Sequence, residues 1–212
     1  TITVAPEIML TGNSQEIDNG DDTPDTDDHT DFVETPTVGG SVVRTFTVTN
    51  PGTAPLTLGN ITINGSSAFS LTTPPASNTV ARLGGTQTFS ITFDPTTAVL
   101  HTATVNIVSD DEDENPFTFD IQGLGITPEI YLSGDSVEIP NGDATPGYTD
   151  LTHFGNAEVV GGTVSRTFQI ENRGTQDLTL SGEPRVTLTG SSSFTVSAQP
   201  TTSPVPKNGG ST

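Results

Sequence analysis

The sequence predicts an all-β protein made of two tandem sandwich domains that follow one another as a rod. Three observations support this fold class: the composition suits pleated sheets, apolar residues alternate along short segments, and one block of sequence occurs twice. Thr, Val, Ile and Phe favour strands, whereas Gly, Pro, Asn and Asp favour turns, and the chain is rich in both groups. No stretch has the apolar periodicity of a helix.

Alternation identifies the individual strands of the first domain. The segment VVRTFTVTN places Val42, Phe46 and Val48 on one face and Val43, Thr45, Thr47 and Thr49 on the other. Three later segments have the same pattern, with inward residues Phe89, Ile91, Phe93, Ala103, Val105, Ile107, Phe117, Phe119 and Ile121. The middle strands carry Leu56, Leu58, Ile61, Ile63, Phe69 and Leu71. With PEIML near the N-terminus, about seven strands in some 120 residues are typical of an immunoglobulin-like β-sandwich.

The internal repeat sets the domain boundaries. PEIMLTGNSQEIDNGDDTP, from residue 6, returns at residue 128 as PEIYLSGDSVEIPNGDATP, an offset of 122. The similarity continues from residues 39–58 to residues 161–180 and, after a three-residue insertion near residue 183, through NGSSAFSLTT and TGSSSFTVSA at an offset of 125. A period near 120 residues is right for tandem domains and too long for a solenoid. We therefore expect one immunoglobulin-like repeat over residues 1–126 and a second, truncated one over residues 127–212.

The second copy stops at Thr212, where the next strand of the first copy begins. A sandwich without its last three strands exposes its interior and its sheet edges. We therefore expect the missing strands further along the native chain or on another chain. The join between the copies, IQGLGITPEI, has no Ser- or Gly-rich spacer, which predicts a stiff connection through Pro128 and hence a rod.

The chain is strongly negative: it has 26 acidic and six basic residues, for a net charge of −20. Such a surface argues against binding nucleic acid or anionic membranes. Cysteine is absent, which excludes disulfides and thiolate sites, and no apolar run is long enough to cross a bilayer. There is no signal peptide, so we interpret the sequence as an internal part of a longer secreted protein.

An acidic loop is the main candidate for chemistry. Between Leu10 and Val42 no strand is convincing, but the apolar residues Ile17, Phe32 and Val38 recur in the second copy, so we expect the loop to fold onto the sandwich. Two carboxylates about 6 Å apart repel by roughly 3 kcal/mol at an effective dielectric constant near 20. Calcium, which takes six to eight oxygen ligands, would relieve this repulsion. The predicted calcium ligands are Asp21, Asp22, Asp25, Asp27, Asp28 and Asp31 in the first copy, and Asp143 and Asp150 in the second.

Other interpretations of the acidic residues stay open. Aspartates in turns often accept hydrogen bonds from their own backbone and then need no metal. Arg44 points inward beside Phe46, so it could form an ion pair with Asp28 or Asp21. A second acidic cluster, SDDEDENP at residues 109–116, is either a calcium site or a solvated turn.

Ordered motifs along the chain resemble a known family. P-E-I, G-G-x-V-x-R-T-F-x-V-x-N, F-x-I-T-F-D-P and D-E-N-P-F-x-F-x-I-x-G are similar to the choice-of-anchor D repeat, which is related to the ASPM–SPD-2–Hydin immunoglobulin-like modules. The resemblance covers residues 6–126 and the truncated second copy. It implies a repeat-built, exported bacterial protein, secreted or surface-anchored and often a substrate of type IX secretion, without catalytic activity. The second copy departs from the pattern with Leu151 and His153 in place of His29 and Asp31.

Residue patterns also predict a protein that is not an enzyme. The three histidines occupy non-equivalent positions, and no G-x-S-x-G, H-E-x-x-H or phosphate-loop pattern occurs. We expect a structural repeat segment of a long extracellular adhesin or filamentous cell-surface appendage, stabilised by calcium. Its partners would be neighbouring repeats and copies of itself in a fibre or bundle, with no nucleic acid and no membrane contact. The alternative is a carbohydrate- or protein-binding module, although the chain has no Trp and only two Tyr.

Overall fold

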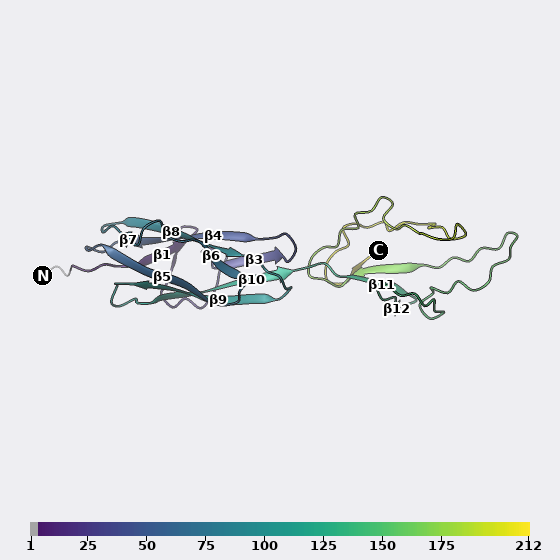
Figure 1. The fold of residues 1–212 in the computed structure, drawn as a ribbon, viewed down its shortest axis with the longest axis horizontal. Coiled ribbons are helices and arrows are strands. Elements are labelled where there is room, and N and C mark those ends of the chain that lie inside the picture. Colours follow the sequence, from purple (N-terminus) through teal and green to yellow (C-terminus); the bar gives the residue numbers. More distant parts are fainter. Residues whose placement is uncertain (1–3) are drawn as a thin grey trace. The chain divides into compact units, whose positions relative to one another are not determined.

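The structure is a computed structural model that describes residues 4–212. It divides into two compact units, Thr1–Ile126 and Thr127–Thr212. The predicted first domain begins at residue 1, and residues 1–3 lie outside the described part of the chain. Residues 4–212 form strands and turns and contain no helix, hence none that could cross a membrane (Figure 1).

Residues 4–126 of unit 1 form ten strands in two five-stranded sheets. The first sheet has the order β2-β1-β4-β8-β6 and the second the order β3-β10-β9-β5-β7. The bounds are β1 Met9–Gly12, β2 Gln15–Ile17, β3 Asp31–Pro36, β4 Val42–Asn50, β5 Leu56–Gly65, β6 Phe69–Thr73, β7 Thr79–Val80, β8 Gly85–Phe93, β9 Leu100–Ser109 and β10 Phe117–Ile126. The predicted all-β, two-sheet architecture is confirmed for this unit.

Alternating aromatic and β-branched residues form the core between the two sheets. The inward residues predicted on β8, β9 and β10 are all at most 5 % exposed, as are Phe46 and Val48 of β4. Phe46 packs against Phe89 at 5.4 Å and Phe119 at 5.3 Å between ring centroids, so it joins strands of both sheets. A second aromatic group at the other end of the core contains Phe32, Phe69 and Phe93.

The prediction of no strand between Leu10 and Val42 was wrong. β2 extends the β1 hairpin, and β3 pairs in parallel with β10, with Asp31 opposite Gln122. Alternation of apolar residues did not predict β3, because Val33 has a positive φ of 58° and the pairing with β10 shifts register between Gln122 and Leu124.

The apolar anchors predicted for this segment have mixed outcomes. Ile17 is 2 % exposed and Phe32 is fully buried, as predicted. Val38 is 86 % exposed because it lies in the turn that leads into β4, so the prediction that it anchors the loop was wrong.

The chain enters unit 1 at one end of the sandwich and leaves at the other. Glu7 donates its N–H to Asn50 Oδ1, at the C-terminal end of β4. Ile126 accepts a hydrogen bond from the N–H of Thr37, beside the N-terminal end of β4. Since β4 runs the length of the first sheet, the two chain ends lie at opposite ends of this unit (Figure 1).

Unit 2 has a single four-stranded sheet of order β12-β11-β13-β14. The strands are β11 Ile130–Gly134, β12 Val137–Glu138, β13 Phe168–Asn172 and β14 Gly210–Ser211. This order matches β2-β1-β4-β8 of unit 1 at sequence offsets of 122 to 125. The tandem-copy, truncation and rod interpretations stay predictions.

The core of unit 1 predicts a graded response to truncation along β4. Phe46→Ala should lower the free energy of unfolding by about 3–5 kcal/mol, because it removes the ring that joins the two sheets. Val43→Ala is the matched control, since Val43 lies on the same strand but is 58 % exposed, and it should change stability by less than about 0.5 kcal/mol. Urea denaturation of both variants measures the difference, and equal losses would contradict this core.

Candidate metal centre and acidic loop

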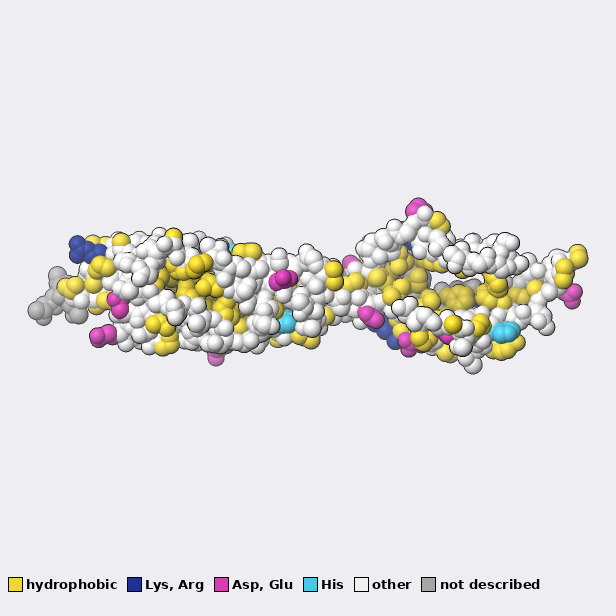
Figure 2. Space-filling view, in the orientation of Figure 1, with side chains coloured by type: hydrophobic (Ala, Val, Ile, Leu, Met, Phe, Trp, Pro, Cys, Tyr) yellow, Lys and Arg dark blue, Asp and Glu magenta, His cyan; other side chains and the backbone are white. Residues whose placement is uncertain are grey.

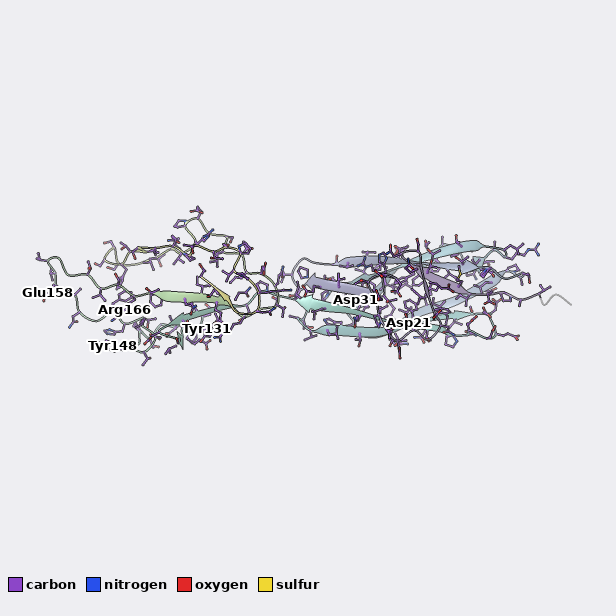
Figure 3. All side chains as sticks on the ribbon, turned by 180° about the vertical axis from the view of Figure 1, so that it is seen from behind. Asp21, Asp31, Tyr131, Tyr148, Glu158 and Arg166 are labelled. Atoms are coloured by element: carbon purple, nitrogen blue, oxygen red, sulfur yellow. The ribbon has the colours of Figure 1, made fainter. Side chains whose placement is uncertain are left out.

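The acidic loop between β2 and β3 is bound to the edge of β10. Gly20 donates its N–H to the Thr118 carbonyl at 2.7 Å, and Asp120 donates to the Asp21 carbonyl at 2.8 Å. Further along, Gln122 donates its N–H to the Thr30 carbonyl. Asp21 and Asp31, near the two ends of this segment, are labelled in Figure 3. The expectation that the loop folds onto the sandwich is therefore confirmed.

Most loop carboxylates accept hydrogen bonds from nearby backbone. Four aspartates each accept through Oδ1 from the N–H two residues further along, which is the geometry of an Asx turn. The pairs are Asp21–Thr23, Asp25–Asp27, Asp28–Thr30 and Asp31–Val33, at 2.7–3.0 Å. These bonds support the turn interpretation for at least one oxygen of each carboxylate.

A buried threonine holds the loop together. Thr30 is fully buried, and its hydroxyl lies 2.6 Å from Asp28 Oδ1 while accepting the N–H of Asp25 at 2.7 Å. Behind it, a Cβ on Gly12 would lie 1.8 Å from the Asp28 carbonyl oxygen, so only glycine fits on β1 at this approach.

Unit 2 repeats this arrangement at an offset of 122 residues. Thr152 bonds Asp150 Oδ1 at 2.6 Å and the N–H of Gly147 at 2.7 Å, and Gly134 lies against the Asp150 carbonyl. The hydrogen bonds from the Thr152 hydroxyl and N–H hold the pKa of Asp150 below its usual value. Asp143, the other predicted ligand in unit 2, accepts two hydrogen bonds from Thr145.

The predicted ion pair between Arg44 and Asp28 or Asp21 is absent within the described part of the chain. Both carboxylates accept bonds from threonines instead, and Arg44 Nε is buried without a hydrogen-bond partner. Arg44 lies near His29 of the loop, whose Nδ1 is also buried and unpartnered. Burial lowers the pKa of His29, and the positive charge of Arg44 lowers it further.

A carboxylate cluster lies elsewhere, at the end of unit 1 where the chain enters. Glu7, Asp111 and Glu114 each offer an oxygen within 4.8 Å of the others. Asp111 is 2 % exposed and its Oδ2 accepts the N–H of Ile8 at 2.7 Å, which ties the β9–β10 turn to the segment before β1. Glu114 Oε2 is inaccessible to solvent and has no hydrogen-bond partner.

The electrostatics of this cluster disfavour three negative charges. Burial raises the pKa of Glu114, and the charges of Asp111 and Glu7 raise it further. Burial likewise raises the pKa of Glu7, followed by the charges of Asp111 and Asp113. Glu7 and Glu114 also line a hollow of about 220 Å³ together with Asp18 and Asn19 of the acidic loop. A divalent cation would offset this repulsion and satisfy Glu114 Oε2.

This cluster, which we call the entry carboxylates, is the only group of three metal-binding side chains among residues 4–212. None of the eight predicted calcium ligands belongs to it, and their assignment as ligands stays a prediction. Asp111 and Glu114 lie in the acidic segment 109–116 that the sequence singled out. Glu7 was missed, because only the tertiary contact between Ile8 and Asp111 brings it there.

Residues 25–124 match the family model described as HYDIN/CFA65/VesB-like, Ig-like domain. The match confirms, for these residues, the predicted immunoglobulin-like fold and the predicted similarity to Hydin-related modules. Domains of this fold are structural or binding modules. A search of curated protein sequences finds no significant match.

Three solved structures with some similarity to this chain have TM-scores below 0.5. A protein of unknown function from Porphyromonas gingivalis W83 has a TM-score of 0.42 and 16 % identity, covering 58 % of this chain and 50 % of its own. The secreted serine protease VesC from Vibrio cholerae has a TM-score of 0.38 and 16 % identity, and the match covers 47 % of this chain and 22 % of VesC. The ASH/PapD-like domain 7 of human CEP192 has a TM-score of 0.37 and 17 % identity, and the match covers 61 % of this chain and 92 % of the CEP192 domain. The matches thus span half of the first protein and about a fifth of the second.

The buried threonine predicts that loop stability depends on one hydroxyl. Thr30→Ala should lower the free energy of unfolding of unit 1 by about 1–3 kcal/mol, because it leaves the N–H of Asp25 without its partner. Thr23→Ala removes a similar bond to Asp21 at an exposed position and should cost less than about 0.5 kcal/mol. Similar losses in urea denaturation for the two variants would contradict the structural role of Thr30.

The lowered pKa of His29 predicts a pH-dependent loss of stability. An unfolded chain binds the proton near the ordinary pKa of 6.5, whereas the folded protein binds it only at lower pH. Stability should therefore fall as the pH drops from about 6.5 through the lowered pKa, and the loss is complete below it. In His29→Asn, which tolerates the positive φ of 71°, this part of the decline should vanish. Unfolding free energies of both proteins between pH 7.5 and 5 measure it, and parallel curves would refute it.

Proposed function

We propose that this chain is a non-catalytic, load-bearing segment of a long extracellular adhesin or filamentous cell-surface appendage. The observation that carries the proposal is the path of the chain through unit 1, which enters beside Asn50 and leaves beside Thr37. A force applied to the two chain ends of unit 1 acts along the strands, so neighbouring strands must slide past one another before this unit unfolds. Hydrogen bonds loaded together in this way resist force better than bonds opened one at a time.

Support for a secreted location comes from the composition and the family. The net charge of −20 keeps a long polymer soluble and disfavours contact with nucleic acid or anionic lipid. In this proposal the partners are neighbouring repeats and, in a fibre or bundle, copies of the same chain. Type IX secretion is the export route we associate with it, through the resemblance to the choice-of-anchor D repeat.

Calcium is the cation that we assign to the entry carboxylates. Three carboxylate oxygens within 4.8 Å, with Asp18 and Asn19 across the hollow, form an all-oxygen set that suits a hard divalent ion. Because Asp111 also binds the N–H of Ile8, a bound ion would strengthen the point where force enters the sandwich.

The mechanical proposal is tested by stretching the chain in a single-molecule force experiment. Unit 1 should open in one step that releases about 400 Å, from roughly 120 residues at ~3.4 Å each. An intermediate or gradual extension at low force would count against a load-bearing role. Saturable capture of one glycan or protein by the same chain would favour the alternative, a binding module.

Calcium binding is tested by thermal unfolding of the same chain. Calcium at 100 times its dissociation constant should stabilise unit 1 by about 2.7 kcal/mol relative to a chelator. Glu114→Gln should abolish most of this response, because it removes the charge of the unpartnered carboxylate. Asp22→Asn is the matched control, since Asp22 is exposed and lies outside the entry carboxylates, and it should respond like the unchanged chain. A calcium response lost only in Asp22→Asn would place the ion in the acidic loop instead.

A further inference from the structure

The outer face of the first sheet of unit 1 carries no charged side chain on three neighbouring strands, β4, β8 and β6. Inward and outward residues alternate along β4 and β8, and the outward residues of these two strands are Val43 and otherwise Ser or Thr. On β6 the outward residues are Ser and Thr as well. We call this surface the neutral face, and it consists of the outward residues of Val43–Thr49, Thr86–Thr92 and Ser70–Thr73.

The acidic residues of unit 1 are concentrated elsewhere. Residues 1–126 contain 17 acidic residues and two arginines, and every acidic residue lies before position 35 or after position 93. Between Arg44 and Asp94 the only charged residue is Arg82, which lies in the turn before β8. The side of unit 1 that faces the viewer in Figure 2 accordingly shows few acidic side chains.

The outer face of the second sheet differs in this respect. Asp120 is among the outward residues of β10, and the acidic loop is bound to the edge of that strand. Two copies of unit 1 that approach through this sheet or through the entry carboxylates bring like charges together, which costs free energy. An approach through the neutral face avoids most of this repulsion, because charges further away than about 8 Å are largely screened at physiological salt.

The hydroxyl groups of the neutral face hydrogen-bond to one another across the strands. Thr45 Oγ1 lies 2.8 Å from Ser90 Oγ, and Thr72 Oγ1 lies 2.9 Å from Thr92 Oγ1. Removing an unpaired hydroxyl from water is costly, whereas these hydroxyls already have a partner within the sheet. Covering the neutral face therefore costs little in lost hydrogen bonds, and it also removes Val43, which is 58 % exposed, from water.

The size of the neutral face sets the strength of a contact through it. Strands of nine residues at ~3.4 Å per residue are about 30 Å long, and three strands at ~4.8 Å spacing are about 15 Å across. The resulting area of about 450 Å² is roughly half of the ~800 Å² that each partner buries in a standard stable complex. One such contact is therefore weak, and several contacts between the same two chains are needed for a stable assembly.

From these observations we propose that the neutral face is a docking surface for the neutral face of a second copy of this chain. The interface is two-fold symmetric, so each copy contributes the same residues. This inference rests on the bundle of copies in the proposed function, and it assigns the surface through which they touch. The acidic loop and the entry carboxylates stay outside the interface, where their charge keeps other surfaces of the chains apart.

Sedimentation equilibrium of the 212-residue chain tests this surface, with a chelator present and a concentration series up to the solubility limit. We expect a reversible monomer–dimer equilibrium. Thr88→Glu should weaken it at least about tenfold, because Thr88 lies on the middle strand of the neutral face and the change brings like charges together there. Thr62→Glu is the matched control, since Thr62 is also exposed but lies on β5 of the second sheet, and it should leave the dissociation constant within about twofold.

A chain that stays monomeric throughout, or equal weakening by the two glutamate variants, would overturn the inference. A charge swap guards against an effect of Thr88→Glu on folding. Thr88→Lys should weaken self-association in the same way, whereas a mixture of the Thr88→Lys and Thr88→Glu chains should associate again, because opposite charges then meet. A mixture that stays monomeric would contradict the proposed face. These experiments measure association, so their failure leaves the load-bearing role standing, whereas gradual extension under force would remove that role and leave the docking surface intact.

Discussion

Contact between aromatic side chains of facing strands is the interaction on which the rest of unit 1 depends. Phe46 contributes to it from the first sheet and Phe119 from the second, and both rings are buried. This contact fixes the spacing of the sheets, and the spacing places the edge of β10 where the acidic loop can bind to it. The loop, the turns and the entry carboxylates are therefore positioned by the core rather than by their own charges.

The carboxylates of unit 1 have two different environments. Those of the acidic loop accept hydrogen bonds from backbone N–H groups two residues further along, which stabilises several negative charges in a short segment. Those at the entry end come from separate segments of the chain, and within residues 4–212 they accept one backbone N–H, that of Ile8. In the second environment, burial and neighbouring negative charges raise the pKa of Glu7 and of Glu114.

Local pattern was enough to predict most of the fold. The strands with strict alternation, such as β8 and β10, were predicted with the correct inward residues because a buried face leaves a period of two in the sequence. β3 could not be predicted this way, because its pairing with β10 is parallel and its residue Val33 has a positive φ. The site was less predictable still: Arg44 and Glu7 owe their surroundings to segments far away in the sequence, and a single sequence carries no record of those contacts.

The opposite placement of the two chain ends in unit 1 has a genetic consequence. A domain whose termini lie at opposite poles can be copied in frame many times, since each new copy begins where the last one stops and no existing strand has to move. Recombination between such copies would then lengthen or shorten the protein by whole domains. Selection could adjust the reach of the gene product without altering a single core residue.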